Sequence, residues 1–477
     1  CDDPGALAGT TPPPRDPRVR LAIEAQVAAL DDAAHDRPTL AVAKRLLPEA
    51  TAVVGAAARL GWLPLVARAR RVRGALQQEL GNGKAARATL VAAAADAAAG
   101  NDPDQLAAIY LDLADLEVDL TSELALGEGW AKLAGGTVAR LGARPRLLLE
   151  VEQTKGRVAL RAGWYDDARA ALAAALALAG GQGVRAQLGV LTDLAIAERR
   201  SDDRAAARVH LEAALALARA ELGPVHPRVG TILHDLGALV FDLGHYAEAE
   251  RYFRDALAVR NRAVGSDAVE TAMTIQSIGS AALMQDRLDE ARAQFTRAIA
   301  LLQARLGPDH PDVASAYSEI GGLYHRTGEY AEALANAQRV LALRERALGP
   351  DHPDVAATLV NLAIEAKNLG RWDLVEPAYP RAIAIFTKAI GADSFEVGMA
   401  QLNLAEARRA QGRLDDAAAA YARVAAIWTA KVGVDHPLLA HVWNGQGQVA
   451  LARGDRAGAR ALLERAVAVR AQAGTRS

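Results

Sequence analysis

Histidines recur at regular places in the second half of the chain, and histidine is a common ligand of transition metals. His226, His310, His352 and His436 each precede a proline, in phrases of the form Gly-Pro-Asp-His-Pro or close variants. A metal site needs several ligands brought to one point, whereas stacked repeats hold equivalent residues about one helix diameter apart. The spacing therefore favours a structural role for these histidines, as punctuation between helices.

The motifs of common nucleotide-binding and hydrolytic enzymes do not occur in this sequence. The phrase closest to a phosphate-binding loop, Gly81-Asn82-Gly83-Lys84-Ala85, lacks both the spacing and the hydroxyl residue of such a loop. There is no His-Glu-x-x-His or Gly-x-Ser-x-Gly motif, and the single cysteine, Cys1, has no adjacent histidine to activate it. We therefore expect a non-catalytic protein with no cofactor and no metal.

Composition argues against several other classes of protein. Lys and Arg total 55 against 57 Asp and Glu, a net charge of −2, so the overall charge recruits neither nucleic acid nor an anionic membrane. No apolar run reaches the roughly 18 residues of a membrane span. Hydrophobic residues make up 51% of the chain but aromatic residues only 4%, which favours small, close-packed helices over a β-rich fold.

An internal repeat supplies the elements that would position any site. The glycine that opens the recurring phrase returns every 42 residues, at Gly223, Gly265, Gly307, Gly349, Gly391 and Gly433. Most units also have a small residue on each side of a turn such as Gly328-Glu329-Tyr330, then a large apolar residue and an alanine. This order resembles the tetratricopeptide repeat, a pair of helices A and B in about 34 residues, here lengthened by about 8.

Each position of the repeat has a physical reason. Gly or Ala permits helices A and B to cross closely, and Gly328 is expected to end helix A in the left-handed conformation. We expect the same of Gly307 at the end of helix B, with Pro311 and Asp312 in the first turn of the next helix A. Pro377 and Pro380 fall inside one helix B, which predicts a kink or a late helix start there.

The pattern continues upstream with looser spacing, and residues 17–60, 63–99 and 103–141 each divide into two helical segments. We predict an all-α fold, a right-handed superhelical solenoid of about eleven tetratricopeptide-like helix pairs. Its parts would be an extended linker over residues 1–16, degenerate repeats over 17–182 and regular 42-residue repeats over 183–477.

Two family resemblances narrow this prediction. Leu-Gly-Pro-Asp-His-Pro-Asp-Val-Ala at 306–314 and 348–356 resembles the kinesin-light-chain type of tetratricopeptide repeat, over roughly residues 183–472. Cys1-Asp2-Asp3-Pro4, the prolines at 12–14 and the segment 60–65 resemble the start of the repeat half of myxobacterial-type serine/threonine kinases. The second resemblance implies the carboxy-terminal part of a signalling kinase, anchored in a membrane by an upstream span, with kinase activity in a domain outside this chain.

An alternative context is a freestanding envelope lipoprotein or assembly factor, with Cys1 as its lipidated first residue, and a cytoplasmic location also remains open. In each case the expected partner is a protein or peptide. No nucleic acid and no direct insertion into a membrane are expected.

Helix A of each repeat should line the inside of the solenoid, where its polar residues suit an extended peptide or a partner helix. Asparagine costs helix stability several tenths of a kcal/mol relative to alanine, so its amides are expected to gain a partner. Lys367 and Arg409 would add a preference for an acidic group, although Glu406 can neutralise Arg409. We name this set the polar ladder: His234, Asp235, Gln276, Ser277, Ser318, Glu319, His325, Asn361, Lys367, Asn368, Asn403, Glu406, Arg409 and Asn444.

Overall fold

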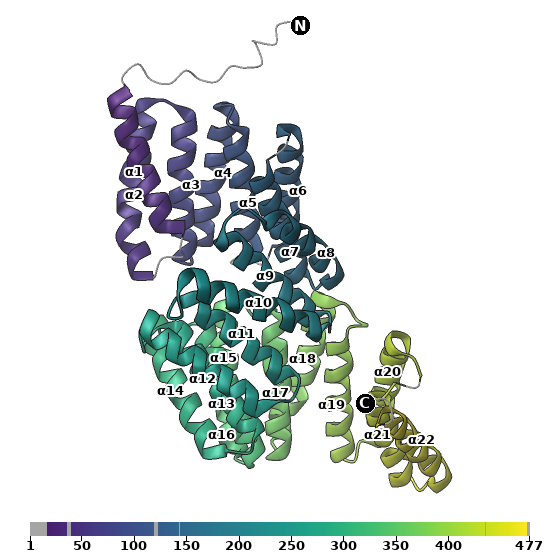
Figure 1. The fold of residues 1–477 in the computed structure, drawn as a ribbon. Helices are drawn as coiled ribbons and strands as arrows, with labels where there is room; N and C mark the ends of the chain where they lie inside the picture. The colour runs from purple at the N-terminus through teal and green to yellow at the C-terminus, as the bar shows by residue number, and fades with distance from the viewer. Residues whose placement is uncertain (1–16, 36–39, 119–122, 143, 435, 475–477) are drawn as a thin grey trace, which may run out of the picture. The chain divides into compact units, whose positions relative to one another are not determined.

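The computed structural model describes residues 17–35, 40–118, 123–142, 144–434 and 436–474. Over these residues the chain forms 22 helices and no strand (Figure 1). The predicted all-α solenoid of about eleven helix pairs is confirmed. The linker predicted over residues 1–16 lies outside the described residues.

The helices belong to two compact units, residues 1–239 and 240–477. The first unit holds α1 (Pro17–His35), α2 (Leu40–Leu60), α3 (Leu63–Glu79), α4 (Gly83–Ala99), α5 (Pro103–Leu116), α6 (Leu124–Leu141), α7 (Pro145–Ala162), α8 (Tyr165–Ala179), α9 (Val184–Arg200) and α10 (Arg204–Leu222). Helix α11 (Pro227–Asp242) crosses the boundary.

The second unit continues with α12 (Tyr246–Ala263), α13 (Val269–Met284), α14 (Leu288–Leu306), α15 (Pro311–Thr327), α16 (Tyr330–Leu348), α17 (Pro353–Asn368), α18 (Trp372–Ile390), α19 (Phe395–Ala410), α20 (Leu414–Val432), α21 (Leu439–Ala452) and α22 (Arg456–Gly474). The division of the sequence at residue 183 concerns the regularity of the repeats and stays a prediction.

Odd-numbered helices are the A helices and even-numbered helices the B helices of the pairs. From α1 to α10 and from α12 to α22 every helix packs against the next along the chain, and A helices also contact one another, for example α5 with α7, α13 with α15, α17 with α19 and α19 with α21. In the described part of the chain, no two B helices pack against each other as closely as these A helices do. Within each unit the A helices therefore lie on the inner side of the stack, as a ligand-binding face requires.

The predicted close crossing of helices A and B is confirmed. A Cβ atom added at Gly279 would lie 2.8 Å from Phe295, and one at Gly447 would lie 2.9 Å from Leu463. The first unit has the same contact at the same offset of sixteen residues, because a Cβ added at Gly74 would lie 2.7 Å from Leu90. Helix B therefore places a large side chain where helix A has none.

Glycines end the helices in two different conformations. Gly328 ends α15 in the left-handed conformation, with φ 78° and ψ 10°, as predicted. Gly307 also has a positive φ, 87°, but its ψ of 160° is extended, so the predicted left-handed conformation is wrong there. The equivalent Gly391 and Gly433 have the same extended ψ, 151° and 165°, although no proline follows them, and this ψ carries the chain away into the loop.

The recurring histidines bind the starts of A helices through their side chains. Nδ1 of His310 accepts the backbone N–H of Asp312 at 3.2 Å, and Nδ1 of His352 accepts that of Asp354 at 3.1 Å. The same bond recurs two residues after His226, at 3.2 Å, and after His436, at 3.3 Å. These histidines act as caps for free N–H groups of the first helical turn, which explains their place before each helix.

Helix α18 begins at Trp372, in step with the other B helices of the second unit, which start 42 residues apart from Tyr246 to Arg456. A late helix start caused by Pro377 and Pro380 is therefore wrong. Both prolines lie inside α18 and are exposed. Water can bind the carbonyl groups that they leave without a helical N–H partner, so the helix continues through them.

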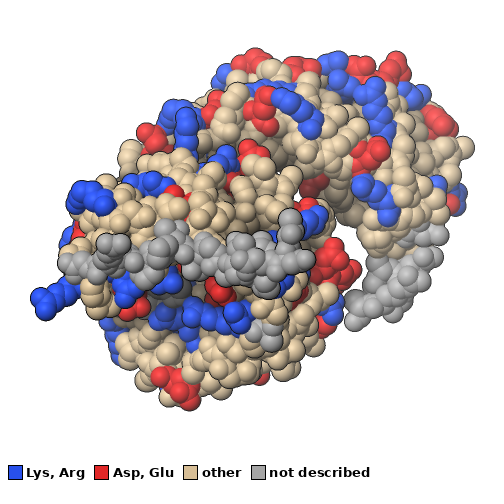
Figure 2. Space-filling view, turned by 90° about the horizontal axis from the view of Figure 1, so that it is seen from above, with Lys and Arg blue, Asp and Glu red and all other residues tan. Residues whose placement is uncertain are grey.

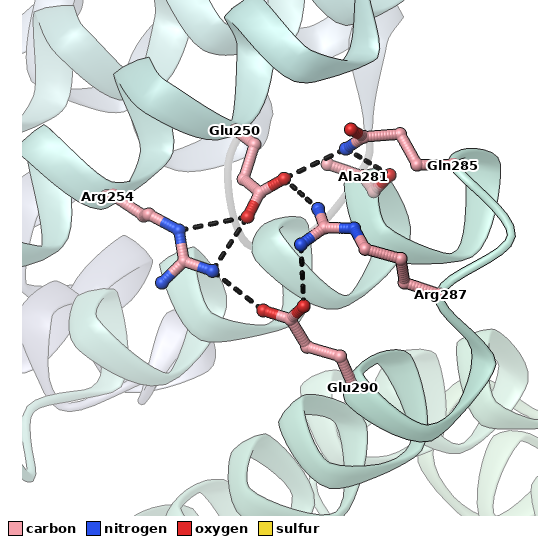
Figure 3. A network of polar contacts seen from close by, with 6 residues as sticks. All are labelled: Glu250, Arg254, Ala281, Gln285, Arg287 and Glu290. Atoms are coloured by element: carbon pink, nitrogen blue, oxygen red, sulfur yellow. Dashed lines mark hydrogen bonds and ion pairs between the residues drawn. The ribbon is translucent and has the colours of Figure 1, made fainter.

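A network of charged side chains joins α12 to the next helix pair (Figure 3). Glu250 is only 7% exposed and accepts hydrogen bonds from Arg254 at 2.7 Å, from Gln285 at 2.9 Å and from Arg287. Arg254 and Arg287 both also contact Glu290. Burial alone raises the pKa of Glu250, but the hydrogen bonds from Gln285, Arg254 and Arg287 outweigh it and hold the pKa below its ordinary value of 4.5.

Replacing Gly279 by alanine should lower the free energy of unfolding by about 1–3 kcal/mol, because the added methyl group overpacks the crossing with Phe295. Gly322→Ala is the matched control, since an added Cβ there meets no atom within 4 Å and alanine favours a helix by up to about 1 kcal/mol. Urea unfolding measures both variants. Equal effects of the two substitutions would contradict a close crossing.

Glu250→Gln should cost about 2 kcal/mol of stability near neutral pH, the contribution of hydrogen bonds to a charged group. Because the folded pKa of Glu250 is depressed, this contribution is complete above about pH 4.5 and disappears as the pH falls through the folded pKa. Urea unfolding of wild type and variant from about pH 8 to pH 3 should show the two converging at low pH.

The control for this series is Glu376→Gln, because Glu376 forms a half-exposed ion pair with Arg413. We expect its effect to stay below about 1 kcal/mol at every pH. A constant difference between wild type and Glu250→Gln over the series would show that Glu250 acts through packing alone.

Candidate functional site

The A helices carry the whole polar ladder. The structure places its members on six of them: His234 and Asp235 on α11; Gln276 and Ser277 on α13; Ser318, Glu319 and His325 on α15; Asn361, Lys367 and Asn368 on α17; Asn403, Glu406 and Arg409 on α19; and Asn444 on α21. His234 and Asp235 precede the boundary between the units. The remaining members belong to the second unit.

Four ionisable members of the ladder, Glu319, His325, Lys367 and Glu406, take part in bridges from one A helix to the next. Ser280 of α13 donates to Glu319 of α15 at 3.2 Å. His325 Nδ1 lies 2.8 Å from Glu365 Oε1 on α17. Lys367 Nζ lies 3.7 Å from Glu406 Oε2 on α19, so Glu406 pairs with the preceding repeat. These side chains hold neighbouring repeats together.

The first unit uses the same device. Arg71 of α3 donates to Asp112 of α5 at 3.0 Å, and Gln153 of α7 donates to Asp193 of α9 at 2.7 Å. The partners are about one repeat length apart in sequence, which is the signal that sequence reasoning can use to find such bridges.

The side chain of Arg409 interacts with the side chain of Tyr421, which lies on the next helix, α20. Burial raises the pKa of the Tyr421 hydroxyl above its usual value, Glu406 adds to this shift, and Arg409 opposes it. Arg409 is only half-buried, but part of its charge is directed at an internal partner.

The asparagines of the ladder behave differently from its charged members. The side chains of Asn361, Asn368, Asn403 and Asn444 form no hydrogen bond with any other described residue, whereas Glu319, His325 and Lys367 are bridged. Asn361 and Asn368 are exposed, and Asn403 and Asn444 are half-buried. Asn361 and Asn403 occupy equivalent positions, 42 residues apart, on the contacting helices α17 and α19.

A cavity of about 220 Å³ lies between α15, α16 and α17. Three ladder residues line it, Ser318, His325 and Asn361. The other lining residues were not predicted: Gly321, Gly322, Ala333, Asn336, Ala337, Val340, Thr358, Ile364 and Glu365.

Glu365 is the residue of this cavity that sequence reasoning missed. It is 7% exposed, and its Oε2 has no hydrogen-bond partner in the described part of the chain. Its spacing from Asn361 and Asn368, four and three residues along one helix, is a signal that places it on the same face.

Charges of both signs are mixed on the face of the molecule drawn in Figure 2. On the face drawn in Figure 2, Lys and Arg side chains are interspersed with Asp and Glu side chains over most of the surface. Among the described residues, no three His, Cys, Asp or Glu side chains gather so that they could hold a metal ion. None of the described helices is long and apolar enough to cross a membrane.

Comparison with known proteins identifies the repeat. The family model of the tetratricopeptide repeat matches residues 187–262, 270–345, 312–388 and 396–472. No curated protein matches the chain. Among solved structures, the apo form of RapI is similar over 78% of this chain and 99% of its own, with 11% identity and a TM-score of 0.52.

Two further structures are similar over shorter stretches. BtubC (BKLC) from P. vanneervenii is 23% identical, with a TM-score of 0.42, over 48% of this chain and 91% of its own. Repeats from Podosopora anserina described as a kinesin light chain are 21% identical, with a TM-score of 0.38, over 42% and 93%. Since the family model covers more than half of the 477 residues, the chain belongs to the tetratricopeptide repeat family.

Proposed function

We propose that this repeat protein is a non-catalytic interaction scaffold that docks a peptide or a partner helix on the A helices of its second unit. The observation that carries the proposal is the contrast within the polar ladder: Glu319, His325, Lys367 and Glu406 are bridged between neighbouring A helices, whereas the asparagine amides have no partner among the described residues. An asparagine in a helix costs stability relative to alanine, and a ligand would offset that cost.

The asparagine amides can bind a docked peptide segment of any sequence. Each amide has both donors and an acceptor, so Asn361 and Asn403 can bind the backbone N–H and C=O groups of a docked segment. The bridges from α15 to α17 and from α17 to α19 hold these amides in place before a ligand arrives. A surface that is ordered in advance loses less conformational entropy on binding.

Ion pairs should contribute less to affinity than sequence alone suggested. Glu406 offsets the charge of Lys367 at 3.7 Å, and Arg409 is directed partly at Tyr421. We therefore expect amide hydrogen bonds to supply most of the binding free energy along α17 and α19.

The cellular context of the scaffold is a separate proposal. The resemblance over residues 1–14 and 60–65 supports the sensing or docking part of a bacterial signalling kinase, and an envelope lipoprotein is the alternative. The two contexts predict different reading frames upstream of Cys1, a kinase with a membrane span or a signal peptide. Sequencing that region distinguishes them.

Replacing Asn361 and Asn403 together by alanine should weaken partner binding by about 2 kcal/mol, from two hydrogen bonds of about 1 kcal/mol each. The fold should keep its stability, because neither side chain has a partner within the described chain. The measurement is a pull-down with the wild-type chain, identification of the captured protein, and calorimetry of that protein with wild type and variant.

The matched control replaces Asn261 and Gln338 by alanine, since both are exposed on the B helices α12 and α16. It should bind the partner like wild type. If the ladder variant binds as tightly as the control, the docking site lies elsewhere and the ladder is solvated surface.

A further inference from the structure

We propose that the cavity between α15, α16 and α17 binds the basic side chain, lysine or arginine, of a docked protein segment. The inference rests on the proposed function, because it names the residue type that the docked segment would present. It differs from the acidic preference that Lys367 and Arg409 suggested from sequence.

The first step is the buried carboxylate of Glu365. Its side chain is 9% exposed, and one of its two oxygens, Oε1, lies 2.8 Å from His325 Nδ1. The other, Oε2, is buried without a hydrogen-bond partner. A buried carboxylate oxygen without a donor is costly, and a cation brought into the cavity would remove that cost.

The second step is the absence of an internal cation at this carboxylate. Among the described residues, no lysine or arginine forms an ion pair with Glu365; its partner is His325, which is 47% exposed at the side chain. The nearby Arg344 donates instead to Thr358 at 2.8 Å and to the carbonyl of Asp354. Lys367 is paired with Glu406. The imidazole of His325 reaches Oε1 and leaves Oε2 of Glu365 without a donor.

The third step is that two other polar groups of the wall, Ser318 and Asn336, already donate within the chain. The Ser318 hydroxyl donates to the carbonyl of Ala314 at 3.1 Å, and the Asn336 amide donates to the carbonyl of Tyr317. They offer a ligand the Ser318 oxygen and the Asn336 carbonyl oxygen, which are acceptors like Glu365 Oε2, while the Asn361 amide offers both donors and an acceptor. Ammonium and guanidinium groups are donors without acceptors, so they match this wall and an acidic side chain does not.

The fourth step is the apolar part of the cavity. Ala333, Ala337, Val340 and Ile364 contribute to its lining, and its volume of about 220 Å³ gives room for a narrow aliphatic chain. Lysine and arginine bury their methylene stems against apolar surface and keep the charged end on polar groups. Asn361, also in the lining, connects the cavity to the ladder.

The test uses small cations that imitate the two side chains, n-butylguanidinium and n-butylammonium, with n-butanol as the uncharged probe. Each is titrated into the full chain at about pH 8, where ordinary imidazoles are neutral. Binding is followed by NMR through the ring protons of His325, assigned from their loss in His325→Asn. We expect dissociation constants on the order of 1 mM for the cations and no saturable binding of n-butanol.

Glu365→Gln keeps the shape of the side chain and removes its charge, and should weaken cation binding about tenfold or more. Glu376→Gln makes the same change of charge on the exposed surface of α18 and should leave binding unchanged. Binding of both cations to Glu365→Gln as tightly as to wild type would overturn the proposal, as would equal binding of n-butanol.

A second variant keeps the test decisive if Glu365→Gln proves unstable. Gly322 lines the cavity on an exposed position of α15, and an added Cβ meets no atom within 4 Å there. Gly322→Leu should therefore fold and fill the cavity, abolishing cation binding with Glu365 intact. Undiminished binding to this variant would place the cation outside the cavity.

The outcomes separate this inference from the proposed function. Cation binding that depends on Glu365, with no protein captured on the ladder, would support the cavity and contradict the scaffold. A captured partner whose affinity falls with the Asn361 and Asn403 substitutions but not with Glu365→Gln would support the scaffold and contradict the basic side chain.

Discussion

The close crossing of helices A and B is the contact on which the rest of the structure depends. Where helix A carries Gly279 or Gly447, helix B carries a large apolar residue sixteen positions later, and no side chain fits between them. In these pairs the contact holds the two helices together as one unit, with the A helix on the inner side of the stack. The caps of His310 and His352 then fix where the next A helix begins. The inner face is the product of these two constraints.

The polar residues of that face serve two purposes that sequence alone does not separate. His325 and Lys367 are of residue types that often bind ligands, but each contacts a carboxylate of the next A helix. Asn361 and Asn403 have no such contact. Under the proposed function, stability of the stack and recognition of a partner draw on different side chains of one stripe. A substitution at a bridging residue would confuse the two effects, and a substitution at an asparagine would not.

Sequence predicted most of the fold because its signals are local. The helix pairs over 63–99 and 103–141 follow from periodicity, and the crossing glycines follow from a fixed spacing. Two local predictions were wrong: Gly307 has an extended ψ that leads into the loop, and α18 begins at the same repeat position as the other B helices because Pro377 is exposed. The site was predicted less well, because the pairing of Lys367 with Glu406 and the burial of Glu365 depend on contacts between repeats. Those contacts depend on how the helices of neighbouring repeats pack against each other. The sequence pattern of a single repeat does not determine that packing.

The constant length of the unit has a consequence for how such a chain changes over generations. Because the B helices of the second unit begin 42 residues apart, recombination between two copies of the coding repeat joins equivalent helical positions. A crossing glycine from one copy then still packs against the large residue of helix B. Each histidine cap also still stands directly before the first turn of a helix A. Whole repeats can be gained or lost without damage to the crossing, while the side chains of the inner face vary independently. The array can thus acquire a new binding specificity by exchange of intact units.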